Sequence, residues 1–225
     1  MLIRNNVLYK VEKEDIPENG VFIVPENVKT IKNQAFKDCD NLKVVILPDS
    51  LQRIGEEAFH ACINLRRVIF NNNLNKIGRR AFWGCENLEE AILPENLEKI
   101  GDMVFEDCKN LRIAIIPKKI KKLPDFIFCW CEKLEIIVFP EGLESIGEKA
   151  FFYCKNLKIP TLPTTVKEIG EKAFDGCKSI SENGADITLG NHSSEWRNSM
   201  KVNGILSESN IQTNGNSKET GIREK

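Results

Sequence analysis

Residues 54–65 read Ile-Gly-Glu-Glu-Ala-Phe-His-Ala-Cys-Ile-Asn-Leu, and this pattern returns every 23 residues without a gap. Four columns of like residues run through seven copies: Ile31, Ile54, Ile77, Ile100, Leu123, Ile146 and Ile169; Phe36, Phe59, Phe82, Phe105, Phe128, Phe151 and Phe174; Cys39, Cys62, Cys85, Cys108, Cys131, Cys154 and Cys177; Leu42, Leu65, Leu88, Leu111, Leu134, Leu157 and Ile180. A partial copy precedes them from residue 21. A fixed period of this length predicts a solenoid in which each copy is one coil.

Each copy also contains a short alternating segment, which predicts a strand. In residues 42–48 we expect Leu42, Val45 and Leu47 to point inward and the residues between them outward. Strands of successive coils would lie about 4.8 Å apart and form one parallel sheet. Gly55 suits a tight turn, and residues 56–62 contain helix formers, which predicts one or two helical turns there.

The unit Ile-Gly-x-x-Ala-Phe-x-x-Cys-x-Asn-Leu-x-x-Val-x-Leu-Pro-x-x-Leu-x-x resembles the BspA-like leucine-rich repeat, over about residues 21–180. This resemblance implies an α/β fold, a right-handed solenoid with a parallel concave β-sheet and short helical turns on its convex side. It also implies adhesion or another protein–protein contact, and not an enzyme. Many members of the family carry a signal peptide or a surface anchor.

The repeat boundaries divide the chain into three parts. We expect an N-terminal cap over residues 1–20, the solenoid over 21–183, and a C-terminal cap strand with a mostly disordered polar tail over 184–225. The first residues lack the charged and then apolar pattern of a secretory signal. On sequence alone this favours the cytoplasm, whereas the resemblance favours the cell surface.

Composition argues against several classes of function. The chain has 32 Lys and Arg against 33 Asp and Glu, so no nucleic-acid partner is expected. No apolar run reaches the roughly 18 residues of a membrane-spanning helix. With two histidines, no glycine-rich phosphate loop and no convergent set of catalytic groups, we expect no catalytic residues, no metal site and no cofactor.

Seven of the eight cysteines form the cysteine column, which predicts a buried, reduced thiol in each coil. The eighth, Cys129, falls in a variable outward column and is predicted to be exposed. An asparagine column that includes Asn64 and Asn87 precedes the strands, where a short amide can bond the neighbouring backbone.

The outward positions of the strands are unusually apolar. As partner-binding residues the pattern predicts Ile46, Arg67, Ile69, Glu90, Ile92, Ile113, Ile115, Ile136 and Val138. A contiguous apolar patch usually meets a partner, here a protein or peptide. Stacked β-branched residues also stabilise a sheet by themselves, so a structural role stays open. Two other possibilities also stay open: this face associates with itself, or the chain is an intracellular adaptor.

Two further groups of residues are candidate surface features. Trp130, Phe152 and Tyr153 form a second candidate anchor, because aromatic clusters favour binding. Lysines and an arginine recur at Arg53, Lys76, Lys99 and Lys122, next to the basic segment 118–122. With a net charge near zero, this basic stripe is interpreted as a solvated face.

Overall fold

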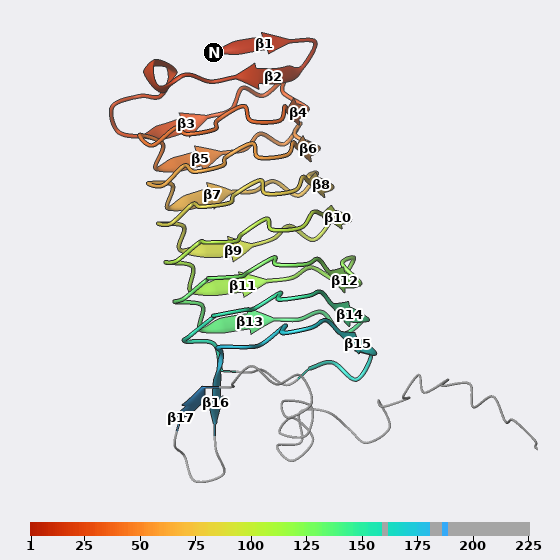
Figure 1. Cartoon of the computed structure of the whole chain (residues 1–225). Coiled ribbons are helices and arrows are strands. Elements are labelled where there is room, and N and C mark those ends of the chain that lie inside the picture. Colours follow the sequence, from red (N-terminus) through yellow and green to blue (C-terminus); the bar gives the residue numbers. More distant parts are fainter. Residues whose placement is uncertain (159–161, 181–185, 189–225) are drawn as a thin grey trace, which may run out of the picture.

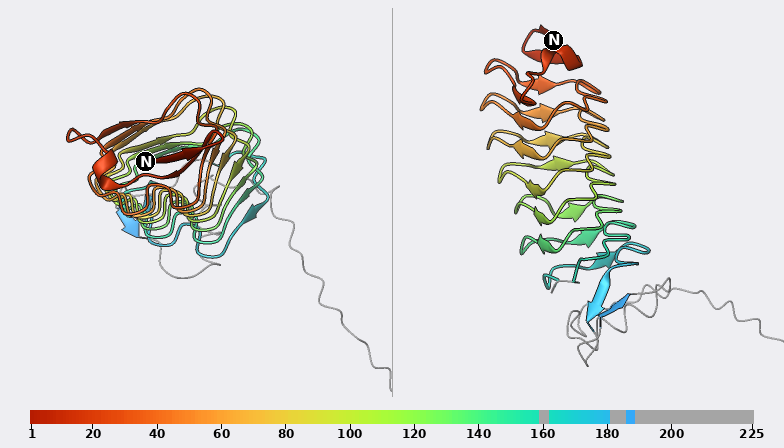
Figure 2. Two further views of the ribbon diagram at one scale, coloured as in Figure 1. Left: turned by 90° about the horizontal axis from the view of Figure 1, so that it is seen from above. Right: turned by 90° about the vertical axis from the view of Figure 1, so that its left-hand side faces the viewer.

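The structure is a computed structural model that describes residues 1–158, 162–180 and 186–188. The coils stack in a single column, with a long strand on one side of each coil and a short strand on another (Figure 1). Seen along the column, successive coils lie over one another (Figure 2).

The strands repeat with the period of the sequence. The long strands are β3 (Val21–Ile23), β5 (Val44–Ile46), β7 (Arg67–Ile69), β9 (Glu90–Ile92), β11 (Ile113–Ile115) and β13 (Ile136–Val138). The short strands are β4 (Thr30–Ile31), β6 (Arg53–Ile54), β8 (Lys76–Ile77), β10 (Lys99–Ile100), β12 (Lys122–Leu123), β14 (Ser145–Ile146) and β15 (Glu168–Ile169). We call the outward side chains of these two sets the long-strand face and the short-strand face.

All pairing between coils is parallel and in register. The long strands form the sheets β3-β5-β7 and β9-β11-β13, and the short strands form two sheets that divide between β10 and β12. At the start of the chain, β1 (Leu2–Arg4) and β2 (Val7–Lys10) form an antiparallel hairpin, and β2 pairs with β4. The 3-10 helix η1 (Lys13–Asp15) follows. At the other end β16 (Lys178–Ile180) pairs antiparallel with β17 (Asp186–Thr188). Most of the predicted tail lies outside the described residues.

The predicted helical turns are wrong. The third side of each coil, such as residues 56–62, consists of turns, and η1 is the one helix among the described elements. Glu57 and Ala61 both have positive φ, at 52° and 54°, and this recurs in every coil. The amide of Glu57 donates to the carbonyl of Arg79 in the next coil, at 2.9 Å. Because alternate amides bond across coils, the i to i−4 bonds of a helix cannot form.

The phenylalanine column forms the centre of the core. Successive rings stack with centroids 4.7 to 5.5 Å apart. Phe59, Phe82 and Phe105 are completely buried. The inward strand residues Leu42, Val45 and Leu47 are buried too, as predicted. Stacked aromatic contacts add to the free energy that area burial provides.

The cysteine column links neighbouring coils. The Sγ of Cys62 donates to the carbonyl of Phe36, 3.0 Å away in the preceding coil, and Cys85 does the same to Phe59 at 3.2 Å. All eight cysteines are free and buried, which confirms the prediction of buried thiols for the column. The prediction for Cys129 is wrong, because it is only 3% exposed. Its column is half-buried or buried in every other coil too, so it lies less far outward than predicted.

The glycine column is required by close approach rather than by φ. A Cβ on Gly78 would lie 2.6 Å from the amide nitrogen of Glu56, and one on Gly55 would lie 2.5 Å from that of Asn33. Real Cβ atoms do not come so near to backbone, so a side chain at Gly55 or Gly78 would push two coils apart. Lys32 and Pro124 occupy the same column in two other coils. Gly84 differs, because its φ is +68° and its nearest neighbour would be 3.8 Å away.

We expect Phe82→Ala to lower the free energy of unfolding by about 3–5 kcal/mol, because it removes a buried ring from the middle of the column. The measurement is chemical denaturation followed by circular dichroism. Ile69→Ala, on an exposed position, serves as the control and is expected to cost less than about 1 kcal/mol. An equal loss in the two variants would contradict the packing described here.

The two kinds of glycine give a second test. Gly78→Ala is expected to cost about 3 kcal/mol, because it overpacks two coils against each other. Gly84→Ala is expected to cost only about 1 kcal/mol, since Ala61 already adopts the same backbone conformation in the preceding coil. Thermal unfolding of both variants measures the difference. The reverse order would show that φ, not spacing, selects the glycine column.

Thiol titration tests the cysteines. Burial raises the pKa of Cys39 to about 11 and that of Cys129 to about 12. Because the thiolate is the reactive form, fewer than about one thiol per chain should react with a chromogenic disulfide at pH 8. After unfolding in guanidinium chloride, all eight should react. A fast-reacting thiol in the native protein that disappears in Cys129→Ser would contradict its burial.

Candidate functional site

The long-strand face presents a row of exposed aliphatic side chains. Parallel pairing places Ile46 beside Ile69 on one three-stranded sheet and Ile92 beside Ile115 on the other. The most exposed members are Ile23 at 63%, Ile69 at 45%, Ile92 at 49%, Ile136 at 50% and Val138 at 46%. Of the other predicted aliphatic residues, Ile46, Ile113 and Ile115 are half-buried. The structure therefore brings the predicted apolar residues together on one surface.

An ion pair divides this row. Arg67 Nε lies 3.2 Å from Glu90 Oε1, and both side chains are partly exposed. Their strands, β7 and β9, stand next to each other in the stack but belong to two different three-stranded sheets. An exposed pair contributes at most about 1 kcal/mol to stability, so its main effect is to set a fixed charge pattern between two apolar areas.

The aromatic candidate residues also lie together, on the turn side of the coils. The rings of Trp130 and Tyr153 stack at 4.5 Å, and Phe152 meets Trp130 edge-on at 6.2 Å. Trp130 and Tyr153 adopt φ values of 61° and 58°, where the equivalent residues Gly84 and Gly176 pay no steric penalty. Trp130 is 38% exposed, so this aromatic pair occupies the surface in spite of an unfavourable backbone conformation.

Several titratable side chains on the turn side have a shifted pKa. His60 stacks on Trp83 at 4.6 Å, and burial lowers the pKa of its imidazole. Burial raises the pKa of the Glu106 and Asp107 carboxyls. Within the described ranges, no three His, Cys, Asp or Glu side chains gather in a way that would hold a metal ion. The same residues include no helix that is long and apolar enough to cross a membrane.

One feature of the short-strand face was not predicted as a site. A groove of about 450 Å³ runs beside the glycine column, past Gly55, Gly78 and Gly101. Lys76 and Lys99, two members of the basic stripe, line it. The signal in the sequence is the glycine column two residues after the basic stripe, which places a bare backbone next to a row of cations.

The fold is shared with known leucine-rich repeat structures. The chain is similar to a leucine rich cell surface protein of Faecalibacterium prausnitzii, with 24% identity, a TM-score of 0.63, and coverage of 77% of this chain and 54% of that one. It is also similar to a leucine-rich repeat protein of Bacteroides ovatus, with 25% identity, a TM-score of 0.56, and coverage of 71% of this chain and 50% of that one. For the leucine rich repeat protein of T. pallidum the identity is 22%, the TM-score is 0.52, and the match covers 76% of this chain and 80% of that one.

This chain spans about half the length of the first two of these proteins. A comparison with curated proteins found no match. A family model described as the BspA type leucine rich repeat region matches residues 20–135 and 121–217, in six copies. The chain therefore belongs to the BspA-type leucine-rich repeat family.

Proposed function

We propose that this chain is a non-catalytic recognition module that binds an apolar segment of a protein on its long-strand face. The observation that carries the proposal is the in-register row of exposed aliphatic side chains. The solvent-exposed face of a sheet normally carries polar residues, because exposing apolar area to water costs about 25 cal/mol per Å². Contiguous exposed apolar patches on soluble domains usually mark interaction sites.

Stacking between coils does not account for the row by itself. Side chains of neighbouring coils do contact one another, yet Ile92 and Ile136 keep 49% and 50% of their area open. A partner that covers this area would gain free energy from each of them. The Arg67–Glu90 pair, placed between the two apolar areas, would fix the orientation of that partner, since charges set register more than affinity.

Adhesion is the setting we propose for this binding. It rests on membership of the BspA-type family and on the similarity to a protein described as a cell surface protein. The aromatic pair of Trp130 and Tyr153 is a second candidate anchor, because exposed aromatic residues contribute most to many interfaces.

Self-association is the second candidate function. In a two-fold dimer the same patch meets itself, so each apolar area would cover the other. Arg67 of one copy would then face Glu90 of the partner subunit, which suits a pair of opposite charges at the centre of the patch. Light scattering over a range of protein concentrations distinguishes a dimer from a monomer.

The proposal predicts that Ile92→Asp combined with Ile136→Asp leaves folding intact and abolishes binding. Peptides are selected from a random display library on the wild-type chain, and their affinities for both forms are compared by biolayer interferometry. We expect apolar-rich peptides whose affinity falls at least about tenfold in the variant, because two carboxylates enter the contact area. The melting temperature should change by no more than a few degrees, because both positions face solvent.

Ile63→Asp is the matched control, because Ile63 is 42% exposed but lies outside the long strands. It should bind the selected peptides like the wild type. Peptides that bind all three forms equally would contradict a site on the long-strand face. A wild-type dimer that the double variant dissociates would favour self-association instead.

A further inference from the structure

The basic stripe on the short-strand face is a row of four exposed cations. Strand pairing puts Arg53 beside Lys76 and Lys76 beside Lys99, and Lys122 follows on β12. All four are exposed, and none makes an ion pair within the part of the chain that the structure describes. Like charges opposite each other on neighbouring strands destabilise a sheet. The fold therefore gains nothing from this arrangement, whereas an anionic ligand would.

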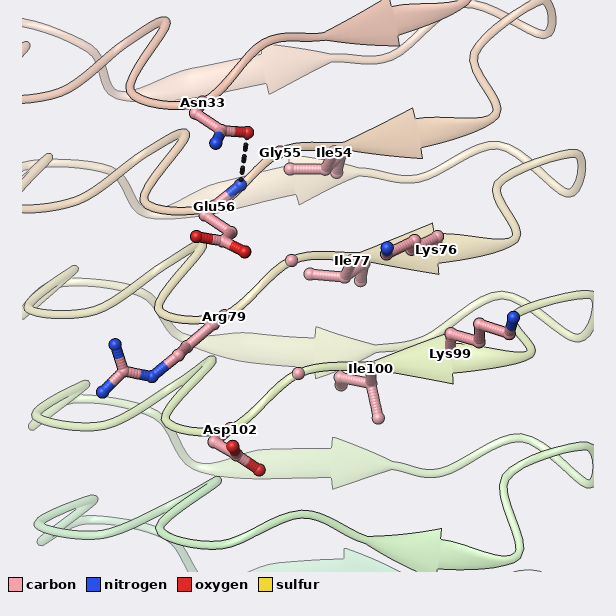
Figure 3. A pocket seen from close by; sticks show the side chains of 12 residues that line it. Asn33, Ile54, Gly55, Glu56, Lys76, Ile77, Arg79, Lys99, Ile100 and Asp102 are labelled. Carbon is pink, nitrogen blue, oxygen red and sulfur yellow. Dashed lines mark hydrogen bonds between the residues drawn. The ribbon is translucent and has the colours of Figure 1, made fainter.

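The bare backbone beside the stripe makes room for such a ligand. Along Gly55, Gly78 and Gly101 no Cβ fits between successive coils, so no side chain fills the groove of about 450 Å³ (Figure 3). In Figure 3 the Lys76 side chain extends toward this glycine column. Lys99 extends the other way along its strand, and it also lines the groove.

Further donors lie on the opposite wall. The guanidinium of Arg79 is exposed, and its contacts are with the sulfur of Met103, at 3.5 Å, rather than with a carboxylate. The amide of Glu56 donates to Asn33 Oδ1 at 3.1 Å. The equivalent amides of Arg79 and Asp102 have no acceptor among the described residues. Cations thus lie on both sides of the groove.

The same wall also offers strong hydrogen-bond acceptors. The carboxylates of Glu56 and Asp102 and the amide of Asn33 line the groove beside Arg79 (Figure 3). A nucleic acid, with a phosphate about every 3.4 Å along each strand, would bring its charges against these carboxylates. The donors of a polyhydroxylated ligand would instead bond to them. None of the described residues that line the groove is aromatic, so a neutral sugar would find no ring among them to stack on.

We infer that this groove binds a linear acidic polysaccharide whose carboxylates meet Lys76, Lys99 and Arg79 and whose hydroxyls donate to Glu56 and Asp102. A repeating polymer suits a repeating row of cations, because four successive coils, from Arg53 to Lys122, each offer a cation at about 4.8 Å intervals. From β6 to β12 the row spans three intervals, or about 14 Å, which is room for a few sugar units. The site is separate from the long-strand face and does not depend on the function proposed there.

Isothermal titration with an oligogalacturonate tests the proposal, and its fully methyl-esterified form is the control ligand. The acid form should bind and the ester should bind at least about tenfold more weakly, because esterification removes the charge and keeps the hydroxyls. Lys76→Gln combined with Lys99→Gln should also lose at least about tenfold. Lys43→Gln combined with Lys158→Gln changes the net charge equally on exposed residues outside the groove and should keep wild-type affinity.

A second variant distinguishes binding through the proposed hydrogen bonds from binding by charge attraction alone. Glu56→Ala combined with Asp102→Ala removes two negative charges, so attraction alone would tighten binding of an anion. The proposed hydrogen bonds require weaker binding, by about tenfold. Poly-glutamate and single-stranded DNA of matched charge should bind more weakly than the oligogalacturonate.

Four results would overturn the inference: no binding of the acid form, equal binding of the ester, tighter binding by the Glu56→Ala/Asp102→Ala variant, or equal losses in the two lysine pairs. Preference for poly-glutamate or DNA would assign the groove to an acidic peptide or a nucleic acid instead. Circular dichroism of each variant confirms that the solenoid is folded.

Discussion

Hydrogen bonding between the backbones of successive coils is the constraint on which the rest of this structure depends. Each coil donates amides not only through its two strands but also through its turn side, as Glu57 does to Arg79. Those bonds hold neighbouring coils at one spacing all the way around. The rings of the phenylalanine column can then stack at 4.7 to 5.5 Å, and each column thiol reaches a carbonyl of the coil before it. A side chain at Gly55, Gly78 or Gly101 does not fit this spacing.

The parts of the fold that follow from side-chain periodicity could be predicted from the sequence. The period fixed the solenoid, and alternation fixed the inward direction of Leu42, Val45 and Leu47. The turn side could not be predicted in the same way. Residues 56–62 have the composition of a helix, and helix propensity is a weak preference that tertiary bonding overrides. The left-handed conformation of Glu57 and Ala61, which prevents the helix, has no signature in those residue types.

The candidate sites also differ in whether side-chain periodicity could predict them. The apolar row could be predicted because outward positions of a strand follow from its inward ones. Burial of Cys129 could not, because the residue types of its column vary between polar and apolar and so give no inward pattern. The groove also escaped prediction, since Gly55 was interpreted as a turn residue, whereas Gly78 of the same column is a point of close approach. Its role becomes visible only when the amide of Glu56 is found 2.6 Å from where a Cβ would stand.

A fixed spacing also turns any column of like residues into a surface with one property. Where the column is aliphatic, each coil adds apolar area to the long-strand face, and affinity for an apolar segment grows with the number of coils it crosses. Where the column is cationic, each coil adds a charge whose repulsion grows in the same way. The aliphatic column lowers its own cost by side-chain contact between coils, whereas the cationic column cannot. For this reason a row such as Arg53, Lys76 and Lys99 is the stronger physical indication of a ligand, although the aliphatic row covers more of the molecule.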